Sequence, residues 1–315
     1  MSKSKSPSRT PLLLNTYGEL RRFAAAFAAG HLNLLIVTGG PGLGKSRLLK
    51  ELVGERASWL DGHVTPFGMY VKLFESRDQP LVIDDVDGMH ADQNAVRLLK
   101  GLCQSDREKQ LSWNSRTRQL DELGIPHRFS TTSKTAIIAN DWQRLNLDVE
   151  ALEDRGHVVH FQPSALEVHR QAAQWFCDQE VFDFVGSRLS FFHQPSFRHY
   201  TSALELKNAG LDWKQATLAR GLSGKPLVVA QLKADDRYES EEARAQAFVA
   251  AGYGCRATYF NVCRRLPAAV EAPALVLKPA APPATSAAET ASATEPASFD
   301  VLDLLRRRHG ELGQG

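Results

Sequence analysis

Eight residues, Gly39 to Ser46, have the types and spacing that can hold a polyphosphate. They read GGPGLGKS and fit the pattern G-x-x-x-x-G-K-[ST] without deviation. Glycines let backbone N–H groups turn toward phosphate oxygens, while Lys45 can reach the β and γ phosphates and Ser46 can offer its hydroxyl to magnesium. The sequence therefore predicts a site for ATP and Mg²⁺, with a chance glycine turn as the alternative. The predicted nucleotide-binding residues are Gly39, Gly40, Pro41, Gly42, Leu43, Gly44, Lys45, Ser46 and Arg47.

Two carboxylates and an amide follow later apolar runs and could complete this chemistry. Asp84 and Asp85 end the run LVIDD, and a nucleotide hydrolase needs one carboxylate for magnesium and one to orient the attacking water. We assign Asp84, with Ser46, to the metal and Asp85 to the water. Asn140 ends the run AIIAN, where its amide could position water or contact the γ phosphate. The alternatives are a solvated acidic turn and a turn-forming asparagine.

These side chains need a parallel sheet to bring them together. Segments that read as buried strands lie at residues 34–38, 79–89, 134–142 and 156–164, separated by helical patterns, the first of them at 17–29. Alternation of this kind is typical of a parallel α/β sheet. Residues 165–220 are mostly helical, with a break at 193–196. The predicted fold class is an α/β P-loop core with a helical lid and a small helix-turn-helix-like region at the C-terminal side.

In their order along the chain, these motifs resemble those of the AAA+ ATPases. GGPGLGKS resembles Walker A, LVIDD resembles Walker B and IIAN resembles sensor 1. The resemblance covers about residues 17–213 and implies ATP hydrolysis by an oligomer, commonly a hexameric ring. It also implies that Arg155, in ALEDRGHVVHFQPS, is an arginine finger and that Arg198, in PSFRHYTSALEL, is the sensor 2 arginine. The alternatives are a surface arginine paired with an acidic neighbour and an ordinary helix charge.

A basic segment between the acidic strand and the asparagine strand is a candidate DNA contact. Residues 105–134 are too long for a plain crossover, and KQLSWNSRT within them alternates enough for a hairpin. Superfamily 3 helicases, a branch of the same family, carry a basic DNA-gripping hairpin in this interval, and the segment is similar in place and charge. Basic side chains would meet phosphate and Trp113 could stack on a base. The candidate residues are Lys109, Trp113, Arg116 and Arg118; a solvated loop with Trp113 packed on the sheet is equally consistent.

A second candidate DNA contact lies at residues 241–266, which resemble a helix-turn-helix. One helix ends near Phe248, Gly252 and Gly254 make a turn, and another helix begins at Arg256. The second helix of such a motif enters the major groove. We expect Phe260 to pack inside and the following residues to face DNA: Arg256, Thr258, Tyr259 and Asn261. An extension of the lid bundle is the alternative.

Composition and segmentation complete the prediction. The net charge of +2 neither requires nor excludes nucleic acid, and the four cysteines form no C-x-x-C pair. Apolar runs fall short of the roughly 20 residues that a membrane helix needs, so we expect a cytoplasmic protein without a membrane partner. The predicted divisions are 1–10 (disordered), 11–163 (α/β core), 164–230 (helical lid), 231–266 (helix-turn-helix-like), 267–298 (Ala/Pro-rich linker) and 299–315 (short amphipathic tail helix).

Two hypotheses with an active ATPase follow from these patterns, and a third option, which the short side chain of Asp85 keeps open, is a binding protein that uses ATP as a switch with little turnover. The first is an oligomeric ATPase of DNA metabolism: a helicase, a helicase loader, or a replication or transposition factor of a mobile element. The second is an ATPase that remodels a protein in defence or signalling, with the tail helix docking a protein partner. The second hypothesis draws on the aromatic segment at 65–74, because aromatic loops between the Walker motifs mark protein-remodelling relatives of the AAA+ ATPases.

Overall fold

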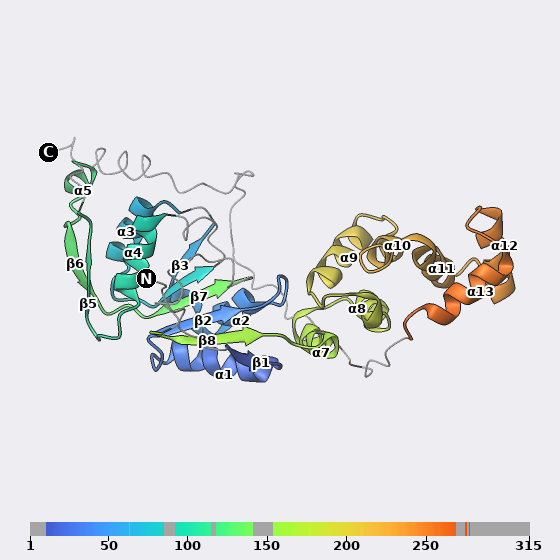
Figure 1. Ribbon diagram of the computed structural model, residues 1–315, viewed down its shortest axis with the longest axis horizontal. Coiled ribbons are helices and arrows are strands. Elements are labelled where there is room, and N and C mark those ends of the chain that lie inside the picture. Colours follow the sequence, from blue (N-terminus) through green and yellow to red (C-terminus); the bar gives the residue numbers. More distant parts are fainter. Residues whose placement is uncertain are drawn as a thin grey trace, which may run out of the picture.

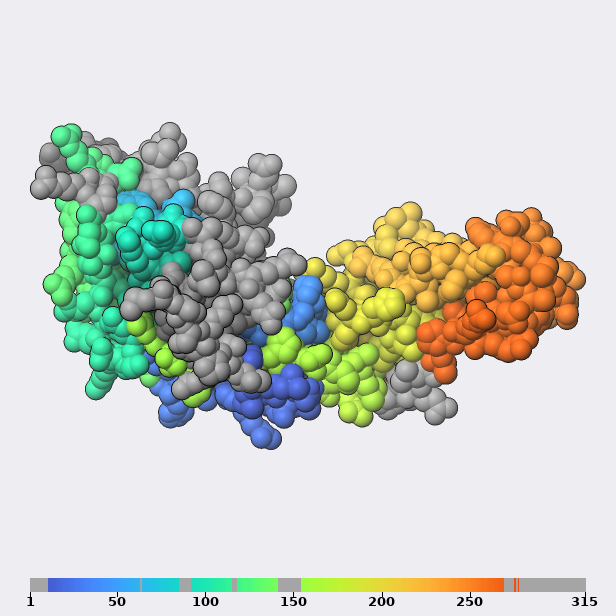
Figure 2. Space-filling view, in the orientation of Figure 1, coloured from blue at the N-terminus to red at the C-terminus, as the bar shows by residue number. Residues whose placement is uncertain are grey.

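The computed structural model describes residues 11–62, 64–84, 92–114, 118–140 and 154–268, together with Leu275 and Leu277. The N-terminal ten residues, Asp85, Arg116 and the tail helix expected at 299–315 lie outside the described residues. In the described part of the chain, an α/β core and an arm of short helices meet at a narrow waist (Figures 1 and 2). None of the described helices has the length and apolar character needed to cross a membrane.

A six-stranded parallel sheet forms the centre of the core. Its strands, in spatial order, are β1 (Leu12–Leu14), β8 (His157–Phe161), β2 (Leu34–Thr38), β7 (Thr135–Ala139), β4 (Leu81–Asp84) and β3 (Ser58–Asp61). All five pairings are parallel. The four strands expected from apolar runs are confirmed, whereas β1 and β3 were not anticipated. Both lie at the edges of the sheet and are short: β1 is only three leucines, two of them exposed, and β3 reads Ser-Trp-Leu-Asp.

Helices cover both faces of the sheet (Figure 1). Alternate residues of β2 point to opposite faces: Leu35 and Val37 pack with one pair of helices, and Leu34 and Ile36 pack with the other. The first pair is α1 (Tyr17–Ala28) and α2 (Lys45–Val53), followed by the 3₁₀ turn η1 (Gly54–Arg56); the second is α3 (Pro66–Glu75) and α4 (Gln93–Leu102). This three-layer packing confirms the α/β class and puts the loops after β2, β4 and β7 at one edge of the sheet.

A two-stranded antiparallel ribbon extends from the α3–α4 side of the core. It consists of β5 (Lys109–Ser112) and β6 (Arg128–Thr131), with the short helix α5 (Arg118–Glu122) between them. A hairpin therefore exists in the basic segment, but its partner strand lies beyond the predicted KQLSWNSRT stretch. Leu111 and Phe129 bury one face of the ribbon against the core, as the alternation of side chains requires.

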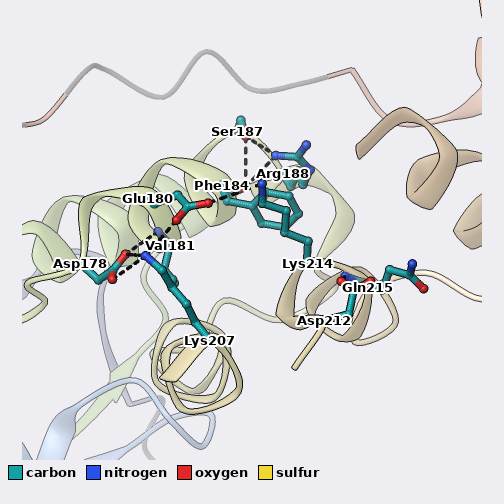
Figure 3. Close-up of polar contacts among 10 residues, drawn as sticks. All are labelled: Asp178, Glu180, Val181, Phe184, Ser187, Arg188, Lys207, Asp212, Lys214 and Gln215. Carbon is teal, nitrogen blue, oxygen red and sulfur yellow. Dashed lines mark hydrogen bonds and ion pairs between the residues drawn. The ribbon is translucent and has the colours of Figure 1, made fainter. Parts of the chain in front are cut away.

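Four helices and a 3₁₀ turn make up the lid. They are α7 (Ala165–Trp175), α8 (Gln179–Gly186), η2 (Leu189–Phe191), α9 (Arg198–Asn208) and α10 (Trp213–Leu218). Lys207 ties three of them together: its Nζ lies 2.7 Å from Asp178 and 2.9 Å from Glu180, which also pairs with Lys214 at 3.5 Å (Figure 3). Partial burial acts to raise the pKa of Asp178, but hydrogen bonds from Lys207 and the Val181 N–H outweigh burial and lower it.

Three further helices form a unit with its own core at the end of the arm. They are α11 (Gly224–Ala234), α12 (Glu241–Ala250) and α13 (Arg256–Arg265), packed around Val229, Ala245, Phe248 and Tyr259. The expected helix–turn–helix corresponds to α12 and α13, while the expected boundary at residue 230 falls inside α11. Leu275 and Leu277 return to the lid, where Gln179 hydrogen-bonds to the backbone of both. Part of the predicted linker is thus packed, because two leucines can bury apolar surface.

Candidate functional site

The segment from Gly39 to Ser46 connects β2 to α2, and its second half, Gly42 to Ser46, lines a cavity of about 350 Å³. The ends of three neighbouring strands meet there, since Thr38 is in register with Ala139, and Asp84 with Ile138. The lid contributes Arg198 to the lining of the cavity. The described residues that line the cavity are Gly42, Leu43, Gly44, Lys45, Ser46, Gly62, Asp84, Ile138, Ala139, Asn140 and Arg198.

Lys45 is the buried cation of this cavity, with 5% of its surface exposed. Its Nζ donates to the carbonyl oxygens of Gly39 at 2.7 Å and Gly40 at 2.8 Å, and it lies 3.3 Å from Oδ1 of Asn140. The last contact joins residues 95 positions apart and exists because β2 and β7 are neighbours. The predicted nucleotide-binding lysine and the predicted sensor 1 asparagine therefore lie side by side.

Ser46 and Asp84 form a pair of oxygen groups beside Lys45. The Ser46 hydroxyl donates to Oδ1 of Asp84 at 2.9 Å, across 38 residues of sequence. Hydroxyl, carboxylate and phosphate oxygens are hard ligands of the kind that Mg²⁺ prefers. The donor set present therefore fits the predicted metal. Asp85, predicted to orient water, lies outside the described residues.

The lid reaches the phosphate loop through the segment before α9. The Phe197 N–H donates to the carbonyl oxygen of Gly42 at 2.8 Å. Arg198, the next residue, lines the cavity, so the predicted sensor 2 arginine lies at the loop. Arg47 does not line it: its guanidinium stacks over the ring of Trp175 at 4.7 Å and approaches Glu51.

Arg155 lies away from this cavity. It precedes β8 and therefore sits at the opposite edge of the sheet from the phosphate loop, where Nη1 donates to the carbonyl oxygen of Lys100 at 2.8 Å. The side chain is exposed. An arginine finger serves the site of a neighbouring subunit, so this placement leaves the role of Arg155 a prediction.

The ribbon differs from the predicted basic DNA contact at two residues. Lys109 is only 1% exposed and its Nζ donates to Asn33 and Ser133 inside the protein. Burial lowers the pKa of Lys109. Trp113 packs on the rings of Phe67 and Tyr70, so it is packed inside as the alternative expected, but on helix α3 rather than on the sheet. Of the four ribbon candidates, Arg118 is exposed and Arg116 lies outside the described residues.

In α13 the predicted inside and outside residues are exchanged. Tyr259, expected to face DNA, is completely buried, and its hydroxyl donates to Glu241 at 2.8 Å. Phe260 is only partly buried. Arg256 is exposed but forms a two-pronged pair with Glu242 at 2.8 Å. Two other candidates remain at the surface, Thr258 in part and Asn261 fully.

The aromatic segment at 65–74 is not an exposed loop. Most of it forms α3, in which Met69 and Tyr70 are 1% and 0% exposed. Phe67 packs against the core. The segment is amphipathic and its aromatic face is used for folding, so it does not support the interpretation as a loop that grips polypeptide.

Comparison with known proteins gives weak similarity. No protein-family model matches the chain. An uncharacterized 36.7 kDa protein of the nrdC–mobD intergenic region of Enterobacteria phage T4 is 25% identical over 136 residues, which are 40% of this chain and 40% of that protein. The chain thus spans less than half the length of that curated relative.

Two similar solved structures are those of NtrX from Brucella abortus in complex with ATP and with ADP. They are 14% identical, have TM-scores of 0.41 and 0.39, and cover 82% of this chain and 70% and 69% of NtrX. At this level of similarity no residue role can be transferred. The fold class rests instead on the strand order and on the phosphate loop that follows β2.

Three aromatic residues at the loop were not anticipated from the sequence: Tyr17, Trp175 and Phe197. Trp175 and Phe197 pack on Gly44, and all three rings pack on one another. Tyr17 follows Thr16, which caps α1 in a capping box with Glu19. That motif locates the start of the helix, but nothing local indicates what the Tyr17 side chain contacts.

Proposed function

We propose that this protein is an AAA+-type ATPase that binds and hydrolyses MgATP and acts on DNA as an oligomer. One observation carries the ATPase part: five residues from four separate segments, each predicted from the sequence or from its resemblance to AAA+ ATPases, line a single cavity. They are Lys45, Ser46, Asp84, Asn140 and Arg198. A cavity that collects a buried cation, paired oxygen ligands, an amide and an arginine suits phosphoryl transfer, in which catalysis is mostly positioning and charge stabilisation.

Each residue has a role that its position supports. Lys45 would exchange its contacts with loop carbonyls for β and γ phosphate oxygens. Ser46 and Asp84 would hold magnesium, which neutralises phosphate charge when bound. Asn140 would orient the attacking water together with Asp85, and Arg198 would stabilise charge that develops on the γ-phosphoryl oxygens.

Oligomer formation and DNA are the finer parts of the proposal. Arg155 is exposed and remote from its own cavity, which suits a finger for the next subunit of a ring. The C-terminal unit supports DNA contact by its exposed α13 surface: Asn261, Arg264 and Arg265 are all exposed. Arginines at a helix end can bind phosphates, while an asparagine can reach a base edge.

The first test is ATP hydrolysis with and without single- and double-stranded DNA. We expect turnover that DNA stimulates and that Lys45→Ala reduces by at least about a hundredfold. Lys50→Ala is the matched control, because Lys50 is an exposed lysine on the same helix, and it should leave turnover unchanged.

The outcomes separate the two hypotheses. If Lys45→Ala hydrolyses ATP as fast as the wild type, the activity comes from a contaminant, and the ATPase proposal is contradicted. Turnover that depends on Lys45 but not on DNA would instead favour a protein substrate, with the tail segment as bait for its partner.

A further inference from the structure

We propose that Tyr17 is a positioning residue for nucleotide binding: its hydroxyl fixes the Leu43–Gly44 peptide so that the Gly44 N–H faces the phosphates. The inference rests on the proposed ATPase function and adds a residue that lies outside the phosphate-loop motif. Tyr17 is the first residue of α1 and is separated from Leu43 by 26 positions.

The contact is direct and buried. The Tyr17 hydroxyl donates to the carbonyl oxygen of Leu43 at 2.8 Å, and the side chain is almost fully enclosed, with 3% of the residue exposed. Burial, with smaller contributions from Glu167 and Tyr200, raises the pKa of Tyr17 far above its usual range. The hydroxyl therefore stays a neutral donor at every working pH, as a fixed support for a carbonyl requires.

Peptide geometry turns this contact into control of a phosphate ligand. In a trans peptide the C=O of one residue and the N–H of the next point in opposite directions. With the Leu43 carbonyl held toward Tyr17, the Gly44 N–H is directed away from Tyr17. Leu43 and Gly44 both line the cavity. A carbonyl turned into that cavity would repel phosphate, whereas an N–H attracts it.

The same arrangement recurs along the loop. Four loop carbonyls have donors: those of Gly39 and Gly40 bind Lys45, that of Gly42 binds the Phe197 N–H, and that of Leu43 binds Tyr17. These donors come from α2, the lid and α1. Lys45 would give up its two carbonyls when phosphate binds, so the supports that remain come from the lid and from α1, and Tyr17 supplies the one from α1.

Packing fixes the position of the Tyr17 ring. Its centroid lies 4.9 Å from that of Phe161, 5.8 Å from Trp175 and 6.0 Å from Phe197, all edge-to-face. The Tyr17 N–H donates to Oε1 of Glu167 on α7 at 3.0 Å. Because these contacts do not use the hydroxyl, Tyr17→Phe should remove the support for Leu43 and leave the ring in place.

The test compares Tyr17→Phe with Tyr200→Phe in the full-length protein. Tyr200 is equally buried, and its hydroxyl also makes one internal hydrogen bond, to Nδ1 of His169 in the lid. The two variants thus lose the same chemical group and a comparable contact. We would measure the Kd of ATP and of ADP, the KM and kcat of hydrolysis, and the urea midpoint of unfolding.

We expect Tyr17→Phe to raise the Kd of ATP and of ADP by about tenfold, which corresponds to the loss of one hydrogen bond. The KM for ATP should rise with little change in kcat. Tyr200→Phe should bind both nucleotides like the wild type. Both variants should have a lower urea midpoint of unfolding than the wild type. In ¹⁵N spectra, ADP should shift the Gly44 amide resonance less in Tyr17→Phe than in Tyr200→Phe.

Each result has one meaning. If the wild type binds ATP, Lys45→Ala does not, and Tyr17→Phe binds as Tyr200→Phe does, the positioning role is overturned and the ATPase proposal stands. If Lys45→Ala binds ATP as the wild type does, or neither binds, both proposals are overturned. Should Tyr17→Phe be too unstable to assay at 25 °C, the ¹⁵N comparison at low temperature decides.

Discussion

Gly42 is the residue at which the phosphate loop and the lid come closest. Its φ of 72° lies in the left-handed region, and a Cβ there would overlap Oγ of Ser196 and approach Cγ of Arg198 at 3.3 Å. The motif allows any residue at this position. In this protein glycine is needed for a second reason, because the side chains of Ser196 and Arg198 in the lid segment lie directly on the loop.

Gly42→Ala should therefore be more destabilising than backbone strain alone explains. Gly210→Ala is the matched control: its φ is 69°, but no atom lies within 4 Å of a Cβ built there. We expect both variants to lose about 1 kcal/mol to the left-handed conformation and Gly42→Ala to lose at least about 1 kcal/mol more. Urea unfolding measures the loss of stability in both variants. Equal losses would show that the Ser196 and Arg198 side chains move aside without an energetic penalty.

At the scale of elements, His169 joins three helices of the lid. Its ring on α7 stacks on Phe182 of α8 at 4.1 Å, and Nδ1 lies 2.9 Å from the hydroxyl of Tyr200 on α9. Gly186 leaves room for it, since a Cβ there would lie 2.5 Å from Cε1 of His169. Burial lowers the pKa of His169 to about 4, although the charge of Asp183 opposes this.

The lid should lose stability in mild acid for this reason. The unfolded histidine takes up a proton below about pH 6.5, whereas the folded one stays neutral down to about pH 4. The stability that neutral His169 gives to the folded state is thus fully present above pH 6.5 and is lost progressively between pH 6.5 and 4. We expect about 2 kcal/mol less stability at pH 5 than at pH 7.5 from this residue.

Urea unfolding at the two pH values tests this, with His169→Gln beside His193→Gln. His193 is exposed, so its replacement should keep the pH dependence. His169→Gln should reduce that dependence by about 2 kcal/mol. An unchanged pH dependence in His169→Gln would show that other groups cause the loss.

At the scale of the whole molecule, the chain has both the candidate nucleotide cavity and a separate exposed arginine. Arg155 and the cavity lie at opposite edges of the same sheet, and Arg155 is held at the end of α4 by the carbonyl of Lys100. A ring in which each subunit supplies Arg155 to its neighbour would complete every site. Mixing two inactive variants tests this arrangement directly.

Arg155→Ala and Lys45→Ala should each lower ATP turnover by at least about tenfold, and an equimolar mixture should regain activity. In a randomly mixed ring, about a quarter of the interfaces pair an intact Lys45 with an intact Arg155. Turnover of the mixture should therefore approach a quarter of the wild-type value. A mixture no more active than its components would show that Arg155 does not act across an interface.

Much of the core could be predicted because its signals are local. The central strands β2 and β7 are buried along their whole length, so each appears in the sequence as an apolar run. Helical spacing of apolar residues indicated α1, and Gly252 with Gly254 separated α12 from α13. The edge strands β1 and β3 were missed because a strand of three or four residues gets its conformation from its neighbour in the sheet rather than from its own residues.

The sequence by itself determined the phosphate loop, the acid and amide at the strand ends, and the order of the elements, because covalent spacing sets these. Tertiary structure alone decided which side chains lie inside, such as Lys109 and Tyr259, and which distant groups meet, such as Tyr17 with Leu43. Such contacts depend on how helices and strands pack, and a period of 3.6 residues cannot say which of two adjacent aromatics, Tyr259 or Phe260, faces the core. The residues of the candidate nucleotide site can therefore be found in the sequence, while their support from α1 and the lid comes from the fold.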